Sequence, residues 1–574
     1  MGDAGGGDLF AIEEREVDGR PLRVFTNAPP SLRTIWQLSA GHGDATYLVY
    51  EGERTSYAEA HTQVAALAHH LAGSLRVTKG DRVAIAMRNY PEWVVAFWAA
   101  AAVGAVVVPL NAWWTGPELA YGLTDSGAKV LVADGERLER LGPHLAGTGV
   151  EAVIAARTDA PVPPGTRAWA DVLDEALDRS GGDATLPPAE VGPDDDATIM
   201  YTSGTTGRPK GAVGTNRNVG AHIMNVIYAT TAPPADAVEP AGSGGSAPAG
   251  GASGLVGERP VTLLTFPLFH VGGLHSFLLP YTVAGGTVVL LYRWDTATAL
   301  DLVEREGVTA IGGVPTTMFE LLDEARRQGR DLPTLTGVAS GATLVPPELV
   351  RRIDGQLGSR AAPTNGYGLT ETAGAAIANV GRRYLDRPNS VGQPISPVME
   401  VRIADPDGRP VPAGETGEVW LRGPTVFRGY HGNSGATAAA LTDDGWFRTG
   451  DAGMLDDDGY LYVVDRLKDV IIRGGENVYA AEVEAVLYEH PDVAEAAIVG
   501  VPDERLGEQV AAVVRLRPGA VTGAEAVRAH VAARLAAFKV PSVVHLTPDA
   551  LPRNAAGKVL KRELRTQLAG EPVA

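Results

Sequence analysis

The chain has 574 residues, which exceeds the usual size of one hydrophobic core, so we expect at least two domains. Hydrophobic residues make up 45 % of it and aromatic residues 6 %, which is typical of a globular protein rather than a disordered or fibrous one. The net charge of -20 argues against a nucleic-acid-binding protein, whose surface would be basic. The chain has no cysteine, which excludes disulfides, thiolate zinc ligands and a cysteine nucleophile.

The N-terminal segment shows no targeting signal. Residues 1–14, "MGDAGGGDLFAIEE", contain neither a basic start nor an apolar stretch, so we expect no secretory signal and a cytoplasmic protein.

Residues 93–110, "WVVAFWAAAAVGAVVVPL", form an uncharged run just long enough to suggest a membrane span. Pro91 suits the first turn of a helix, Gly104 suits its C-terminal end, and the run then turns β-branched at residues 106–108. These signals for the start and end of a helix predict a buried helix followed by a buried strand instead of a membrane span.

Short apolar runs alternate with helical patterns through the first 380 residues, and Gly, Pro or Asp bound most of them. Such runs, flanked by helices, predict parallel strands covered on both faces, so the fold class is α/β with doubly wound sheets. The runs are residues 81–87, 105–110, 129–134, 150–156, 261–266, 286–291 and 308–314.

A glycine-rich loop, "YTSGTTGRPKG", occupies residues 201–211 after an apolar strand and before a helix that we expect from about Asn216. Its glycines let backbone N–H groups turn toward an anion, its hydroxyl side chains add donors, and Lys210 adds a positive charge. The spacing differs from a Walker A loop, because Arg208 and Pro209 separate Gly207 from the lysine. The pattern predicts a phosphate-binding loop of another kind.

Residues 231–258 contain mostly Pro, Gly, Ala and Ser. This composition cannot bury enough apolar surface to offset the entropy of ordering, so we expect a flexible surface insertion. A spacer fits it better than a docking segment for a partner.

From about residue 398 the pattern changes to alternating strands with tight turns, which predicts a β-rich subdomain at the end of the large domain. After residues 465–469 the order is helix, strand, strand, helix, helix, which predicts a separate α+β domain. We therefore expect a large N-terminal domain of residues 1–466 and a small mobile C-terminal domain of residues 469–574.

Five more motifs accompany the loop in a fixed order, and together the six resemble the acyl-adenylate-forming superfamily over roughly residues 45–570. That superfamily includes acyl- and aryl-CoA synthetases, adenylation domains of peptide synthetases and luciferases. The five are "FPLFHVGG" (266–273), "NGYGLTET" (365–372), "WFRTGD" (446–451), "DRLKDVIIRGGEN" (465–477) and "PRNAAGK" (552–558).

The resemblance implies a site for ATP and Mg²⁺. Tyr367 would stack on adenine, Thr370 would touch the α-phosphate, Asp451 and Arg466 would bind the ribose hydroxyls, and Glu371 would coordinate Mg²⁺. Without the motif, Asp451 and Arg466 would be interpreted as ordinary loop charges that can pair with each other. The complete set implied for ATP is Thr202, Ser203, Gly204, Thr205, Thr206, Lys210, Gly341, Ala342, Asn365, Gly366, Tyr367, Gly368, Thr370, Asp451 and Arg466, with Thr202 also at the metal.

The resemblance also implies the catalytic and acyl-binding residues. Lys558 would bridge the acyl carboxylate and the α-phosphate, since a cation between two anions lowers the barrier to their reaction. Glu371, Thr202 and His270 complete the implied catalytic set, with His270 at the mouth of the acyl pocket. The pocket would be lined by His270, Val271, Gly272, Gly273, Ala373 and Gly374.

A second step would transfer the acyl group to the thiol of CoA after the small domain rotates. Lys468 would be the hinge, and Gly474, Gly475 and Glu476 would form the loop brought to the site. No residue of the chain needs to form a covalent intermediate, in keeping with the missing cysteine.

The small residues of the acyl segments suggest a roomy apolar tunnel for a medium or long fatty acid, a steroid-like side chain or an aryl acid. An acyl-CoA synthetase, compatible with a homodimer, is therefore the leading hypothesis. The alternative passes the adenylate of an acid, even a small inorganic one, to a carrier protein, an amine or another acceptor. A luciferase-type oxygenase and a non-catalytic ATP-binding scaffold also stay open, although a scaffold has no need of Lys558.

Overall fold

The structure is a computed structural model that describes residues 9–158, 162–202, 208–231, 259–466, 469–473, 476–503, 505–554 and 557–569. The predicted insertion at 231–258 lies outside these ranges apart from Thr231, the last residue of α7 (Asn216–Thr231). This helix begins where the sequence pattern placed it.

The first sheet has eight strands in the order β21-β11-β10-β6-β5-β7-β8-β9. Strands β10, β6, β5, β7, β8 and β9 are parallel to one another, whereas β11 pairs antiparallel with β10 and β21 pairs antiparallel with β11. The bounds are β5 (Arg82–Ala86), β6 (Val106–Pro109), β7 (Val130–Asp134), β8 (Ala152–Ala156), β9 (Thr166–Ala168), β10 (Asp196–Thr202), β11 (Lys210–Thr215) and β21 (Gly429–Tyr430).

The second sheet has nine strands in the order β18-β17-β16-β15-β14-β12-β13-β3-β4, and its centre from β16 to β3 is parallel. The predicted parallel strands therefore exist, but they are divided between two sheets. The bounds are β3 (Thr46–Tyr50), β4 (Glu53–Ser56), β12 (Val261–Leu264), β13 (Thr287–Leu290), β14 (Ala310–Gly313), β15 (Gly337–Gly341), β16 (Ala362–Leu369), β17 (Gly374–Val380) and β18 (Gln393–Pro394).

Helices cover both sheets, as apolar strand runs require. The largest core cluster joins the two sheets through the helices between them, α1 (Leu32–Ser39), α2 (Tyr57–His69), α3 (Pro91–Ala102), α7 and α9 (Leu279–Ala284), with α6 (Trp169–Ser180) beside α2. Outside the first sheet lie α4 (Gly116–Ser126) and α5 (Gly135–Leu141). Outside the second lie α10 (Thr296–Arg305), α11 (Pro315–Gln328) and α12 (Pro347–Leu357).

The uncharged run at 93–110 is a buried helix and a buried strand, as predicted. Residues 93–102 of α3 are all buried, Gly104 has a φ of 75° just after the helix, and β6 follows in the first sheet. Within the described ranges, no helix combines the length and the apolar character that crossing a membrane requires.

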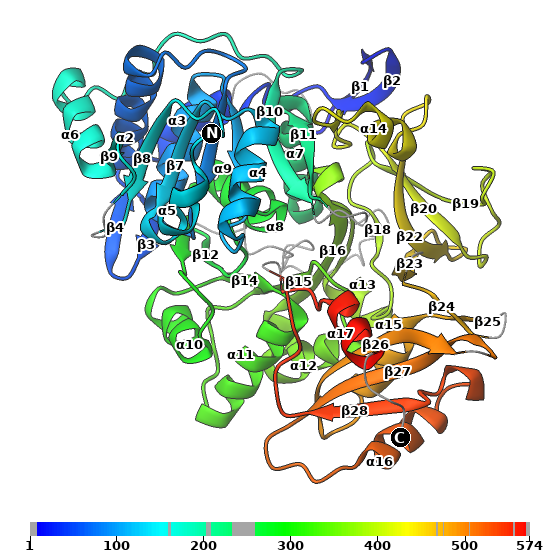
Figure 1. The fold of residues 1–574 in the computed structure, drawn as a ribbon. Helices are drawn as coiled ribbons and strands as arrows, with labels where there is room; N and C mark the ends of the chain where they lie inside the picture. Colours follow the sequence, from blue (N-terminus) through cyan, green and yellow to red (C-terminus); the bar gives the residue numbers. More distant parts are fainter. Residues whose placement is uncertain are drawn as a thin grey trace, which may run out of the picture.

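The predicted β-rich subdomain is a four-stranded antiparallel sheet in the order β19-β20-β22-β23. Its strands are β19 (Glu400–Ala404), β20 (Gly417–Arg422), β22 (Phe447–Leu455) and β23 (Leu461–Arg466), with α14 (Ser434–Ala440) nearby. In Figure 1 this sheet lies in yellow beside the large α/β part. An N-terminal hairpin of β1 (Ile12–Val17) and β2 (Arg20–Phe25) also forms.

The small C-terminal unit has its own sheet, in the order β25-β24-β27-β26 with β28 beside β27, and its own core. The predicted helix, two strands and two helices are present, and three short strands complete the unit. The bounds are β24 (Ile471–Arg473), β25 (Glu476–Val478), α15 (Ala480–Tyr488), β26 (Val493–Asp503), β27 (Gly507–Leu516), α16 (Ala524–Ala532), β28 (Val543–Thr547) and α17 (Lys561–Ala569). Figure 1 shows this unit in orange and red against α11 and α12.

Candidate active site

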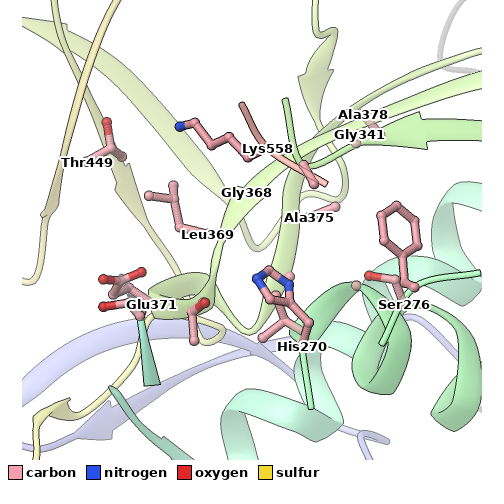
Figure 2. A pocket seen from close by; sticks show the side chains of 18 of the residues that line it. His270, Ser276, Gly341, Gly368, Leu369, Glu371, Ala375, Ala378, Thr449 and Lys558 are labelled. Carbon is pink, nitrogen blue, oxygen red and sulfur yellow. The ribbon is translucent and has the colours of Figure 1, made fainter. Parts of the chain in front are cut away.

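A cavity of about 840 Å³ is lined by residues of the first and second sheets, the β-rich subdomain and the small unit. Its walls include strands β14 to β17, helix α7, the segment 266–277, and Asn554 and Lys558 of the small unit. Figure 2 shows the Lys558 side chain entering from one side, with Glu371 and His270 on the other. Residues from all six sequence motifs therefore surround this one space, although the middle of the glycine-rich loop is not described.

The floor of the cavity is one face of strands β14 to β17. The register pairs Gly337 with Ala310, Ala339 with Thr364, and Gly366 with Ala378. Side chains two positions apart on a strand share a face, so these small residues form one continuous surface. The small floor residues that line the cavity are Ala310, Gly337, Ala339, Gly341, Thr364, Gly366, Gly368, Ala375, Ala378 and Val380.

Opposite this floor lie apolar residues of α7 and of the helical segment that follows His270. A wide π-helical turn at residues 274–278 separates α8 (Val271–Gly273) from α9, and Ser276 and Phe277 from this turn line the cavity. Phe277 packs closely on the sheet, because a Cβ atom on Gly312 would lie 2.2 Å from the Cζ atom of its ring.

Charge is confined to one end of the cavity. The charged lining residues of the described chain are Lys210, Glu371, Glu418, Arg448, Arg466 and Lys558. None of them comes from β14, β15, α7 or the segment 266–277. The cavity thus combines a polar end, suited to a nucleotide, with an uncharged end suited to an apolar group.

The ends of the glycine-rich loop are fixed by strand pairing. Thr202, the last residue of β10, lies opposite Lys210, the first residue of β11, and both line the cavity. The predicted phosphate-binding residues Ser203, Gly204, Thr205 and Thr206 lie outside the described residues.

Glu371 is buried, with 7 % of its surface exposed, and it lines the cavity. The Tyr430 hydroxyl donates a hydrogen bond to Glu371 Oε1 over 2.7 Å, and the Lys210 ammonium lies 4.3 Å from the centre of the Tyr430 ring. Tyr430 thus holds the carboxylate and contacts the loop lysine at once. No sequence motif marks this tyrosine, which lies on β21, far along the chain from both partners.

Asp451 is paired twice within the protein. It accepts a hydrogen bond from the Tyr367 hydroxyl at 2.7 Å and forms an ion pair with Arg466 Nε at 2.7 Å. Burial raises the pKa of Asp451, and the nearby Arg466 opposes that shift. The ion pair between Asp451 and Arg466 is the contact expected of these charges without any motif. Binding of the ribose hydroxyls by Asp451 and Arg466 stays a prediction. Of Tyr367, Asp451 and Arg466, only Arg466 lines the cavity.

Lys558 is held by a tight turn of the small unit. The Asn554 N–H donates to the Lys558 carbonyl over 2.8 Å, and the Lys558 N–H donates to Asn554 Oδ1 over 2.9 Å. Gly557 has a φ of 78°, and a Cβ atom there would lie 2.8 Å from Val314 of the large unit. Burial, and then the positive charge of Arg466, lower the pKa of Lys558 to about 8.

His270 lines the cavity, and its burial lowers its pKa to about 4, so the imidazole is neutral near pH 7. It can therefore donate or accept a hydrogen bond in the cavity but adds no charge there.

Several predicted residues lie behind the wall rather than on it. A Cβ atom on Gly273 would lie 2.2 Å from the Pro267 carbonyl oxygen, so this glycine serves close backbone packing. The carbonyl of Ala373 accepts a hydrogen bond from His275 Nδ1 at 2.9 Å. Of the other acyl-pocket predictions, His270, Val271, Gly272 and Gly374 do line the cavity.

The residues predicted to bind ATP also fall into two groups, those that line the cavity and those that do not. Gly341, Ala342, Gly366, Gly368 and Thr370 line the cavity, whereas Asn365 is buried on the other face of β16. Tyr367 is likewise absent from the lining residues, with its hydroxyl on Asp451 as described above.

Of the residues predicted for domain rotation, the structure describes only Glu476, which is not among those that line the cavity. Glu476 is exposed on β25, and Lys468, Gly474 and Gly475 lie outside the described residues. The four-stranded sheet ends with Arg466 and the small sheet begins with Ile471, so the chain passes between the two units in this interval.

Comparisons with known proteins agree with this architecture. The model of the AMP-binding enzyme family matches residues 35–431, and that of the AMP-binding enzyme C-terminal domain matches residues 482–558. The chain belongs to the AMP-binding enzyme family. The resemblance to the acyl-adenylate-forming superfamily is thereby confirmed, and the relatives that follow, which are CoA ligases, confirm the predicted class, an AMP-forming acid–thiol ligase.

Among its relatives, the feruloyl-CoA synthase of an Amycolatopsis species is 38 % identical over 521 residues, which cover 91 % of this chain and 95 % of that protein. The indoleacetate–CoA ligase of Aromatoleum aromaticum is 36 % identical, with 89 % and 93 % covered. The crystal structure of ATP-bound MatB from Rhodopseudomonas palustris is similar with a TM-score of 0.78 and 29 % identity, covering 93 % of this chain and 99 % of that one.

Proposed function

We propose that this enzyme uses ATP to activate a bulky, apolar monocarboxylic acid, an aryl acid or a fatty acid, and transfers the acyl group to CoA. The observation that carries the proposal is the single cavity that joins Lys558, Glu371 and Arg466 at one end to an uncharged floor of small residues at the other. A second carboxylate on the substrate would be buried there without a cation, which is costly.

The first step joins two anions. A carboxylate oxygen of the acid bonds to the α-phosphorus of ATP, the bond to the β-phosphate oxygen breaks, and pyrophosphate leaves. Lys558 enters the cavity as a cation between these groups, where it would stabilise the charge that accumulates in the transition state. In the second step the thiol attacks the acyl carbonyl carbon, loses its proton, and displaces AMP.

Mg²⁺ fits this site as a companion of the nucleotide. In the described chain, no group of three or more His, Asp or Glu residues could hold a metal ion by itself. Mg²⁺ commonly takes one or two carboxylates plus substrate phosphates, so the buried Glu371 carboxylate and the Thr202 hydroxyl are a suitable protein share. The ion would supply charge neutralisation on the phosphates, and Tyr430 would keep the Glu371 carboxylate in place.

The test is to measure pyrophosphate, AMP and thioester for a panel of acids with and without CoA, and to identify each product by mass. The panel pairs aryl and C8–C16 alkyl acids with dicarboxylic acids of matched length. We expect an apolar acid to give AMP and its CoA thioester, and the dicarboxylic acids to give little. Pyrophosphate release without CoA consumption would instead favour a carrier protein, an amine or another acceptor. Turnover of dicarboxylic or inorganic acids alone would refute the proposed substrate class.

The thioester step is proposed to follow rotation of the small domain, residues 469–574, about Lys468, with the 474–476 loop entering the site. Lys468→Pro should then slow thioester formation more than pyrophosphate release, and equal slowing of both steps would contradict the hinge. A cytoplasmic location and a homodimer stay predictions, which cell fractionation and light scattering can check.

A further inference from the structure

Helix α11 of the large unit lies against the small unit in two places. At its N-cap, Val314 contacts Gly557, the residue before Lys558. Further along the helix, Phe319 and Asp323 face residues of the small unit. Figure 1 shows α11 and α12 in green on the side of the large unit that faces the orange small unit.

Asp323 forms an ion pair across the two units. Its Oδ2 accepts a hydrogen bond from Arg517 Nη1 of the small unit at 3.1 Å. Its Oδ1 accepts from Arg352 Nη1 of α12 at 2.9 Å and from Arg326 Nη2 of α11 itself at 3.2 Å. The carboxylate therefore sits among three arginines, and one of these belongs to the other unit.

An aromatic pair lies beside this ion pair. The rings of Phe319 on α11 and Tyr488 on α15 are stacked, with centroids 6.5 Å apart and an interplanar angle of 18°. The Arg352 guanidinium lies 5.0 Å from the Phe319 ring centre and so joins the aromatic and ionic contacts. Together Phe319, Asp323, Tyr488 and Arg517 form an interdomain patch.

We infer that this interdomain patch positions Lys558 for adenylation, because the same helix carries both the patch and the surface on which the Lys558 turn rests. Asp323 and Arg517 are thus positioning residues for the first half-reaction and have no part in the second. The inference rests on the proposed function for its kinetic test. The preferred orientation of the small unit, which the patch would impose, can be tested without relying on the proposed function.

The experiment compares Arg517→Glu, Arg517→Lys and the control Arg326→Ala. The control removes an arginine that pairs with the same carboxylate but does not cross between the units. Two rates are measured: pyrophosphate release from acid and ATP, and thioester formation from preformed acyl-adenylate and CoA. Because the chain has no cysteine, Leu38→Cys and Val521→Cys also provide two unique label sites, one on each unit, for distance measurements.

We expect Arg517→Glu to slow pyrophosphate release about three- to tenfold, since it replaces an exposed ion pair with a like-charge contact. Thioester formation from preformed adenylate should be unchanged or faster, and the label distances should broaden. Arg517→Lys should retain most of the rate, and Arg326→Ala should change neither rate nor distances.

Equal slowing of both half-reactions by Arg517→Glu, or unchanged rates and distances, would overturn the inference. So would an equal effect of Arg326→Ala. If the wild-type chain released no pyrophosphate with any acid, the proposed function would fail, while the label distances would still decide whether the patch orients the small unit.

Discussion

The lowered pKa of Lys558 predicts a falling rate of adenylation in the alkaline range. Burial in the cavity and the nearby Arg466 bring this pKa to about 8, while Asp469 and Asp451 limit the shift. A lysine with a lowered pKa is charged below that value and loses its proton as the pH rises through it. From pH 7 to pH 9 the charged fraction would fall about tenfold, whereas an unshifted lysine would lose only about 3 %.

The assay is pyrophosphate release between pH 6.5 and 10, analysed separately as kcat/KM for ATP and as kcat. The kcat/KM profile reports the free enzyme and should bend near pH 8. The kcat profile should bend at a higher pH, because the bound phosphates stabilise the charged form of Lys558. Lys558→Arg, whose charge persists throughout this range, should show a lower rate without the bend. A wild-type kcat/KM profile without a bend up to pH 10, or the same bend in Lys558→Arg, would refute the reasoning.

Three further predictions test the cavity. Tyr430→Phe removes the donor to Glu371, which is worth about 1.5 kcal/mol, so kcat for pyrophosphate release should fall about tenfold; an unchanged kcat would mean that the hydroxyl does not hold the carboxylate. Ala339→Leu adds bulk to the floor of the cavity, so KM for the largest accepted acid should rise at least about tenfold while KM for ATP stays unchanged. Equal changes in both KM values would mean that residue 339 does not face the acid. Gly374→Ala puts a Cβ atom 2.6 Å from His222 at a φ of 124°, so the free energy of unfolding should drop by about 1–3 kcal/mol in a denaturant titration. Ala373→Gly, at a φ of 54°, should not lower it.

The elements of the fold were predictable where one periodic signal dominated. The apolar runs gave the parallel strands, and the Pro91 and Gly104 punctuation distinguished α3 and β6 from a membrane span. The assignment of each strand to one of the two sheets was not predictable, because strand order is set by long-range packing. Strand β21 shows the reason: Tyr430 pairs with Ala212 in a two-residue strand that no local pattern marks.

The residues of the candidate site were also predictable only in part. Motif residues such as Lys558, Glu371 and His270 meet at one cavity. The partner that holds Glu371, Tyr430, came from outside every motif, and Gly273 and Ala373 lie behind the wall. A motif fixes which residues are near the site, but it cannot show which side of a tight turn faces the substrate.

The cavity is assembled from separate parts of the chain, and this has an evolutionary consequence. The acid would be recognised by small residues on β14 to β17 and by α7, while the proposed cation, Lys558, lies on a loop of another structural unit. Ala310, Gly337 and Ala339 belong to the floor but not to the residues predicted to bind ATP. Substitutions at such positions would change the acid that a lineage accepts and would leave the proposed reacting groups in place.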